Sequence, residues 1–187
     1  MNRATTDQDL IGRIARRDRA AVEVLYGRHH VRVYRFAMRF VRNEAVAEEL
    51  VNDVFLDIWR HADRFDGRSS VTTWMLAMVR NKAISLLRRR SEEGLDEQMA
   101  RNIEDRSDDP EVAAQKGDKG LMIRQCMEKL SADHREVIDL VYYHEKSVRE
   151  VSEITGTSES TVKTRMYYAR KQLGELLKDA GIDRGWP

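Results

Sequence analysis

The sequence SVREVSEITGTSESTVKTRMYYARKQLGELL, residues 147–177, has the pattern of a helix, a tight turn and a longer helix. In its first part apolar side chains recur at helical spacing, at Val148, Val151 and Ile154. Gly156 follows directly, and glycine readily takes the left-handed conformation that ends a helix. Thr157 and Ser158 have hydroxyl groups that can accept backbone N–H groups at the start of the second helix.

The predicted second helix has two distinct faces. One face is apolar and consists of Val162, Met166, Ala169, Leu173 and Leu176; the other consists of Thr161, Thr164, Arg165 and Tyr168. The basic residues are Lys163, Arg165, Arg170 and Lys171, and no acidic residue occurs over 160–171. A short helix, a turn with glycine and a basic second helix is the helix-turn-helix pattern, in which the second helix enters the DNA major groove. The alternative is a basic amphipathic helix packed within an ordinary helical protein.

The composition indicates a soluble globular protein of one domain or two small ones, with 187 residues, of which 41% are hydrophobic and 35% charged. No stretch approaches the ~18 apolar residues of a membrane span. The N-terminal sequence MNRATTDQDL has no apolar signal core. We therefore expect a cytoplasmic protein without direct membrane insertion. The single cysteine, Cys126, excludes an internal disulfide, and we expect it to fill space on a helix face rather than to act as a redox switch.

The net charge of +1 hides four blocks of charge along the chain. Two blocks are basic: residues 11–42 contain nine arginines and two acidic residues (+7), and residues 68–90 contain six basic residues and no acidic one (+6). The other two blocks are acidic: residues 44–66 contain seven acidic residues and two arginines (−5), and residues 91–118 contain ten acidic and three basic residues (−7). The two basic blocks are suited to binding phosphate groups. Alternatively, the blocks neutralise one another as ordinary surface ion pairs.

Hydrophobic periodicity predicts helices and no strands along the chain. We expect helices over 7–17 (capped by Asp7 or Asp9), 19–42, 44–60 (capped by Asn43), 71–90 and 110–129, and a further helix from Ser131 or Asp133 into the helix-turn-helix. The acidic segment 91–109 has few large apolar residues and cannot bury enough surface to fold alone. The predicted fold is all-α, with a helical domain over 1–90, a flexible acidic linker over 91–109 and a second helical domain over 110–187.

Trp74 lies near the start of the predicted helix over 71–90, where we expect it to point the same way as Met78 and Leu86. Two interpretations of Trp74 are open. It is a core residue, or it is an exposed aromatic beside arginine and lysine side chains, an arrangement that holds unpaired bases.

The sequence contains no motif of a catalytic, metal or cofactor site. Its five histidines form no H-E-x-x-H motif and do not combine with Cys126 at a zinc-like spacing. No glycine-rich phosphate loop and no G-x-S-x-G motif occurs. Asp53 and Asp57 are four residues apart on one predicted helix and could hold a divalent cation, but an acidic face turned to solvent or to a basic partner is favoured. We expect no enzyme activity, no metal and no cofactor.

Two blocks of the sequence resemble one protein family. AVAEELVNDVFLDIWRHADRFDGRSSVTTWMLAMVRNKAISLLRRR, residues 45–90, resembles region 2 of bacterial RNA polymerase sigma factors of the extracytoplasmic-function (ECF) group. LSADHREVIDLVYYHEKSVREVSEITGTSESTVKTRMYYARKQL, residues 130–173, resembles their region 4. The order of the blocks, their spacing and the acidic linker also match. The resemblance implies a subunit that makes no bond itself but directs core RNA polymerase to promoter DNA.

The resemblance implies three binding surfaces and a protein partner. The residues implied to bind core polymerase are Glu49, Leu50, Asn52, Asp53, Val54 and Phe55. Those implied to bind the melted −10 element are Phe65, Arg68, Ser69, Ser70, Trp74, Arg80, Asn81 and Lys82. Those implied to bind the −35 duplex are Ser160, Thr161, Lys163, Thr164, Arg165 and Tyr168, with Arg170 and Lys171 serving mainly phosphates. Factors of this group are commonly held inactive by an anti-sigma factor, so such a partner is expected.

The chain departs from the family pattern at four positions. Asn52 stands where the family usually has Gln, Ser85 where Asp is common, Ser131 where Pro is common and Tyr168 where Arg is usual. Because Tyr168 is on the implied −35 surface, the −35 preference cannot be transferred from relatives.

Two other functions compete with this interpretation. A helix-turn-helix regulator that never joins polymerase leaves the block over 45–90 unexplained. A sigma mimic that binds only an anti-sigma partner would have lost the basic face of the second helix, which this chain keeps.

Overall fold

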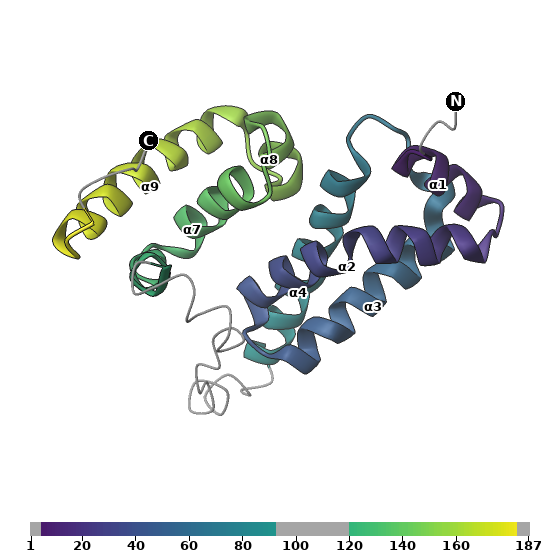
Figure 1. The fold of residues 1–187 in the computed structure, drawn as a ribbon, viewed down its shortest axis with the longest axis horizontal. Helices are drawn as coiled ribbons and strands as arrows, with labels where there is room; N and C mark the ends of the chain where they lie inside the picture. Colours follow the sequence, from purple (N-terminus) through teal and green to yellow (C-terminus); the bar gives the residue numbers. More distant parts are fainter. Residues whose placement is uncertain (1–4, 93–119, 183–187) are drawn as a thin grey trace. The chain divides into compact units, whose positions relative to one another are not determined.

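The structure, a computed structural model, describes residues 5–92 and 120–182. The chain divides into two compact units, Met1–Ile103 and Glu104–Pro187, and the described parts of both are helical, without a strand (Figure 1). The prediction of an all-α fold with two helical units is confirmed. The predicted linker over 91–109 lies outside the described residues, except that its first two positions continue the last helix of the first unit. The predicted domain limits therefore remain predictions.

The described part of the first unit is built on one long central helix. Its elements are α1 (Asp7–Ala15), α2 (Arg19–Val41), α3 (Glu44–His61), the short 3₁₀ turn η1 (Ala62–Arg64) and α4 (Val71–Glu92). Helix α2 packs against α1, α3 and α4, and α3 also packs against α4. Fully buried side chains at these contacts include Leu25, Phe36, Val54, Ile58 and Met75. This packing places α3 and α4 next to each other.

The helix starts of the first unit follow local capping chemistry. The predicted cap of α1 by Asp7 or Asp9 is wrong, because Thr6 is the cap: its Oγ1 accepts from the Asp9 backbone N–H at 3.1 Å. The Asp9 carboxylate accepts in return from the Thr6 backbone N–H at 3.0 Å, which completes a capping box. The prediction for α3 is confirmed, since Asn43 Oδ1 accepts from the Val46 backbone N–H at 3.0 Å.

The buried face of α4 does not contain Trp74, for which the sequence left two interpretations open. Its buried side chains are Val71, Thr73, Met75, Leu76, Val79 and Ala83, whereas Trp74, Met78 and Leu86 are half-buried. The helical row that contains Trp74 also contains Lys82, so this row borders solvent. The row of Val71, Met75, Val79 and Ala83 is free of charge and can face α2.

The second unit contains the predicted helix-turn-helix. Its described elements are a helix over 120–128, α7 (Ala132–Ile138), the π-helical turn η2 (Asp139–Tyr143), α8 (Val148–Thr155) and α9 (Glu159–Asp179). Ser131 caps α7, since its Oγ accepts from the His134 backbone N–H at 3.3 Å. The start of the predicted helix over 110–129 lies outside the described residues. Among the helices of either unit that the structure describes, none combines the length and the apolarity needed to cross a membrane.

The turn between α8 and α9 has the predicted chemistry. Gly156 ends α8 in the left-handed region, with φ 67°, and Ser158 Oγ caps α9 by accepting from the Thr161 backbone N–H at 3.2 Å. Helix α9 packs against α7 and α8. Its buried stripe is Val162, Met166, Ala169, Leu173 and Leu177, so the stripe ends at Leu177 instead of the predicted Leu176. The opposite face of α9 is thereby turned to solvent.

Gly156→Ala is expected to destabilise the second unit by about 1–2 kcal/mol, because an alanine side chain disfavours the left-handed conformation. A Cβ at position 156 would meet no atom within 4 Å, so backbone strain is the only cost. Gly174→Ala is the matched control: it lies within α9, also has open space around the added Cβ, and should stabilise by about 0.5–1 kcal/mol. Urea unfolding of the full chain measures both changes in the free energy of unfolding. Changes of the same sign for the two variants would contradict this prediction.

Candidate functional site

Helix α3 turns an acidic face to solvent. Glu49, Asn52 and Asp53 are exposed. In contrast, Leu50, Val54 and Phe55 are buried, with exposed fractions of 5%, 0% and 5%. The structure therefore divides the six residues implied to bind polymerase into three polar side chains that a partner can contact and three apolar side chains that anchor α3 in the core.

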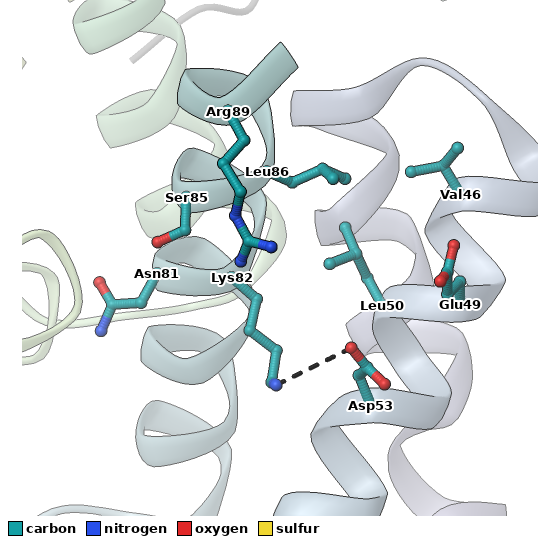
Figure 2. A pocket seen from close by; sticks show the side chains of 9 residues that line it. All are labelled: Val46, Glu49, Leu50, Asp53, Asn81, Lys82, Ser85, Leu86 and Arg89. Atoms are coloured by element: carbon teal, nitrogen blue, oxygen red, sulfur yellow. Dashed lines mark ion pairs between the residues drawn. The ribbon is translucent and has the colours of Figure 1, made fainter. Parts of the chain in front are cut away.

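A groove lies between this acidic face and α4 (Figure 2). It has a volume of about 390 Å³ and is lined by Val46, Glu49, Leu50, Asp53, Asn81, Lys82, Ser85, Leu86 and Arg89. Figure 2 shows carboxylates on the α3 side and the basic side chains of Lys82 and Arg89 on the α4 side. The groove brings together residues that the sequence assigned to two different surfaces, one for polymerase and one for −10 DNA.

The ammonium group of Lys82 binds carboxylates of α3. Its Nζ lies 2.7 Å from Asp57 Oδ2 and 3.9 Å from Asp53 Oδ2. The side chain of Lys82 is 27% exposed and that of Asp57 is 31% exposed, so the closer pair is partly shielded from solvent. Lys82 was expected to contact DNA, and in this structure it links α4 to α3.

An aromatic pair and a polar loop lie at the start of α4. The rings of Phe65 and Trp74 are both half-buried, and their centroids are 5.2 Å apart. Ser70 Oγ accepts from the Thr73 backbone N–H at 3.1 Å, which ties this hydroxyl to the first turn of α4. Trp74 is thus neither a fully buried core residue nor fully exposed.

The exposed loop residue Arg68 pairs with Asp66. Its guanidinium binds the Asp66 carboxylate, and its backbone N–H donates to Asp66 Oδ1 at 3.0 Å. The side-chain hydrogen bond from Arg68 lowers the pKa of the Asp66 carboxyl below its ordinary value. Of the other residues implied to bind −10 DNA, Asn81 is exposed and Ser69 and Arg80 are half-buried.

Helix α9 exposes all but one of the residues implied to bind −35 DNA. The exposed ones are Ser160, Thr161, Lys163, Thr164, Tyr168, Arg170 and Lys171. The exception is Arg165, whose side chain is 23% exposed and whose Nη2 binds Asp133 Oδ2 of α7. This ion pair uses one of the five N–H donors of the guanidinium and orients the group at the edge of the helix.

Asp133 and Tyr167 adjoin the implied surfaces and were not predicted from the sequence, whereas Asp57 was predicted only as part of an acidic face and not as the partner of Lys82. Asp57 and Asp133 hold the two cations described above, and no local pattern pairs residues so far apart in sequence. Tyr167 is 61% exposed and its ring lies edge-on to Tyr168, with centroids 5.3 Å apart. Its helical spacing from Lys163 and Lys171 could have placed it on the same face of α9.

No cluster suited to a metal ion was found in the described parts of the two units: no three or more His, Cys, Asp or Glu side chains come together there. Cys126, the lone cysteine, is buried, and its Sγ lies 3.5 Å from the Leu176 carbonyl oxygen. Cys126 therefore packs against the inner side of α9, as expected for a space-filling residue.

Comparisons with known protein families match both units. Residues 25–93 match the family model Sigma-70 region 2, and residues 120–173 match the model Sigma-70, region 4. The first match covers most of α2, with α3 and α4 and the surfaces around the groove. The second covers α7, α8 and the part of α9 that contains the exposed basic face.

Similar proteins and structures extend these matches to nearly the whole chain. The chain is 32% identical over 181 residues to the ECF RNA polymerase sigma factor SigK of Mycobacterium tuberculosis. The aligned region covers 94% of this chain and 96% of SigK. The sigma factor RpoE, in its co-crystal structure with the anti-sigma factor NepR from Bartonella quintana, has a TM-score of 0.66 and 32% identity, over 81% of this chain and 91% of that chain.

CnrH, solved in complex with the cytosolic domain of CnrY, shares the fold at a TM-score of 0.66 and 24% identity, over 92% of this chain and 97% of that chain. The fold, the two family models and the full-length similarity to SigK lead to one assignment. The chain belongs to the ECF family of RNA polymerase sigma factors.

Proposed function

We propose that this chain binds core RNA polymerase and directs it to promoters, contacting the −35 element as duplex and the −10 element as melted DNA. The observation that supports this most is the solvent-exposed, basic and hydroxyl-rich face of α9 within a helix-turn-helix. The bond-making chemistry belongs to the polymerase, so the chain itself is not an enzyme. A subunit of the bacterial transcription machinery acts in the cytoplasm.

The polymerase-binding surface is proposed to be the acidic face of α3. Glu49, Asn52 and Asp53 would contact a basic partner directly. Leu50, Val54 and Phe55 would act indirectly, because their burial fixes the orientation of the helix that presents those polar groups. This assignment narrows the six residues implied by the family to three contacts and three supports.

The −10 surface is proposed to lie over the loop before α4 and along that helix. Phe65 and Trp74 form a half-buried aromatic pair on which an unpaired base can stack. Arg68, Ser69, Ser70, Arg80, Asn81 and Lys82 would supply polar and phosphate contacts. Extruding a base costs a few kcal/mol, so stacking and phosphate binding must offset that cost.

The −35 surface is proposed to be the exposed face of α9. Ser160, Thr161, Lys163, Thr164, Arg165 and Tyr168 would face base edges, and Arg170 and Lys171 phosphates. The hydroxyls of Ser160 and Thr161 each lie 2.9 Å from Ser158 Oγ, so the N-terminal turn of α9 presents a connected set of hydroxyl groups. Such groups bind either bases or phosphates.

Arg165→Ala and Lys171→Ala are expected to affect −35 binding in different ways. An arginine paired with guanine contributes about 1–3 kcal/mol of discrimination, so Arg165→Ala should flatten the preference among −35 sequences. Lys171→Ala should weaken binding to every sequence about equally and reduce the salt dependence. Binding of the holoenzyme to duplexes with −35 substitutions measures both, and the same uniform loss for both variants would contradict this division.

We infer an anti-sigma protein as a second partner, because the related RpoE was crystallised with the anti-sigma factor NepR. Such a protein would keep the chain from core polymerase until a signal releases it. An anti-sigma protein would be identified if the purified candidate inhibits transcription that depends on this chain and if an excess of the chain restores it. A candidate that binds the chain without affecting transcription would not qualify.

Run-off transcription with purified core polymerase on a genomic promoter library tests the proposed function. We expect transcripts that depend on the chain and start at promoters with a shared −35 and −10 pair. Tight binding to DNA without binding to core polymerase would instead indicate an independent regulator. Tight binding to one small protein, with no dependent transcript, would indicate a sigma mimic.

A further inference from the structure

The ion pair of Lys82 joins the two surfaces that the proposed function assigns to different macromolecules. Lys82 is on α4, among the residues proposed for −10 DNA, and its Nζ lies 2.7 Å from Asp57 Oδ2 on α3. A second carboxylate, Asp53 Oδ2, lies 3.9 Å from the same Nζ and belongs to the residues proposed to bind polymerase. Figure 2 shows Lys82 extending across the groove toward Asp53.

An ammonium group held in this way is a poor ligand for phosphate. It can contact DNA only if it leaves its carboxylate partners, and those carboxylates repel the incoming phosphates. The closer carboxylate, Asp57, is about one-third exposed, so its attraction for Lys82 is less screened than that of the half-exposed Asp53. A cationic partner that binds the carboxylates of α3 would remove both obstacles.

We propose that Asp57 is a positioning residue that acts through Lys82: with Asp53 it holds the ammonium group on α3 in the free chain, and polymerase binding to α3 releases it for −10 DNA. This inference rests on the proposed function of α3 and α4. It makes the affinity of the chain for single-stranded promoter DNA depend on whether polymerase is bound. The family resemblance does not place Asp57 among the residues that bind polymerase or DNA, so it did not predict this role.

The test measures binding of the full chain, free and in holoenzyme, to a labelled non-template strand from a promoter that the wild-type holoenzyme uses. For the free chain, Asp57→Asn should raise the affinity about threefold or more, since one more cation becomes available to phosphate. In holoenzyme the same variant should differ from wild type by less than about 1.5-fold, because Lys82 is already released.

Three further variants separate this mechanism from general electrostatics. Glu48→Gln removes one exposed negative charge from the same helix without touching Lys82, and should leave the affinity of the free chain nearly unchanged. The double variant with Asp57→Asn and Lys82→Gln should not show the increased affinity for DNA that Asp57→Asn shows alone. Asp57→Glu, which keeps a carboxylate, should bind like wild type. Thermal unfolding of each variant checks that α3 and α4 still pack.

Equal affinities of the free wild-type chain and Asp57→Asn would overturn the inference, whether the two bind weakly or not measurably. An equal gain in free chain and holoenzyme would also overturn it, because the carboxylate would then only repel DNA. A gain that survives in the double variant would exclude action through Lys82. Failure of the proposed function is a separate result, in which the wild-type holoenzyme itself makes no transcript from the promoter.

Discussion

Glu49→Lys combined with Asp53→Lys is expected to weaken binding of the chain to core RNA polymerase about a hundredfold. Both side chains are exposed on one face of α3, four residues apart, and neither is part of the core. Reversing a charge that faces a basic partner replaces attraction by repulsion. We expect each reversal to cost about 1.4 kcal/mol of binding free energy, which is about tenfold in Kd. Competition binding of labelled full chain to purified core polymerase measures the loss.

Glu48→Lys is the matched control for this double variant. Glu48 is exposed on the same helix and undergoes the same change of charge, but it lies about 100° around the helix from Glu49. Its replacement should weaken polymerase binding far less, and thermal unfolding should show all variants folded. A loss for Glu48→Lys equal to that of either single reversal would mean that overall charge, rather than this face of α3, determines binding.

Local chemistry made the helix limits predictable from the sequence. Asn43, Gly156 and Ser158 act on backbone groups within a few residues of themselves, so their roles could be inferred without knowing the fold. The α1 cap was missed because Thr6 and Asp9 form a reciprocal pair, and either end of such a box can be taken for the cap.

Tertiary packing decided the features that the sequence did not predict. Which row of α4 is buried depends on the approach of α2 and α3, and Trp74, Met78 and Leu86 looked as apolar as the row that is actually buried. The ion pairs of Lys82 with Asp57 and of Arg165 with Asp133 join residues 25 and 32 positions apart on different helices, so no periodicity within one helix could indicate them. Similarity to a family assigns positions to a surface, but burial decides which of them a partner can touch.

Trp74→Ala is expected to reduce transcription from duplex promoters by about tenfold or more. Stacking of a base on an aromatic ring contributes about 1–3 kcal/mol, or about 5- to 150-fold, and this gain must offset the cost of unpairing the base. The half-buried ring of Trp74 beside Phe65 is the aromatic surface available for this at the start of α4. Permanganate reactivity of the melted strand and the run-off rate measure the loss.

Trp74→Phe and Trp59→Ala distinguish stacking from stability. Trp74→Phe keeps an aromatic ring and should retain most of the activity. Trp59 is also half-buried in the first unit, where Arg17 lies over its ring at 5.4 Å from the centroid, so Trp59→Ala removes similar packing away from the −10 surface. If Trp59→Ala lost as much strand opening as Trp74→Ala at equal thermal stability, Trp74 would act through the fold. If only Trp74→Ala lost it, the ring of Trp74 would hold the unpaired base.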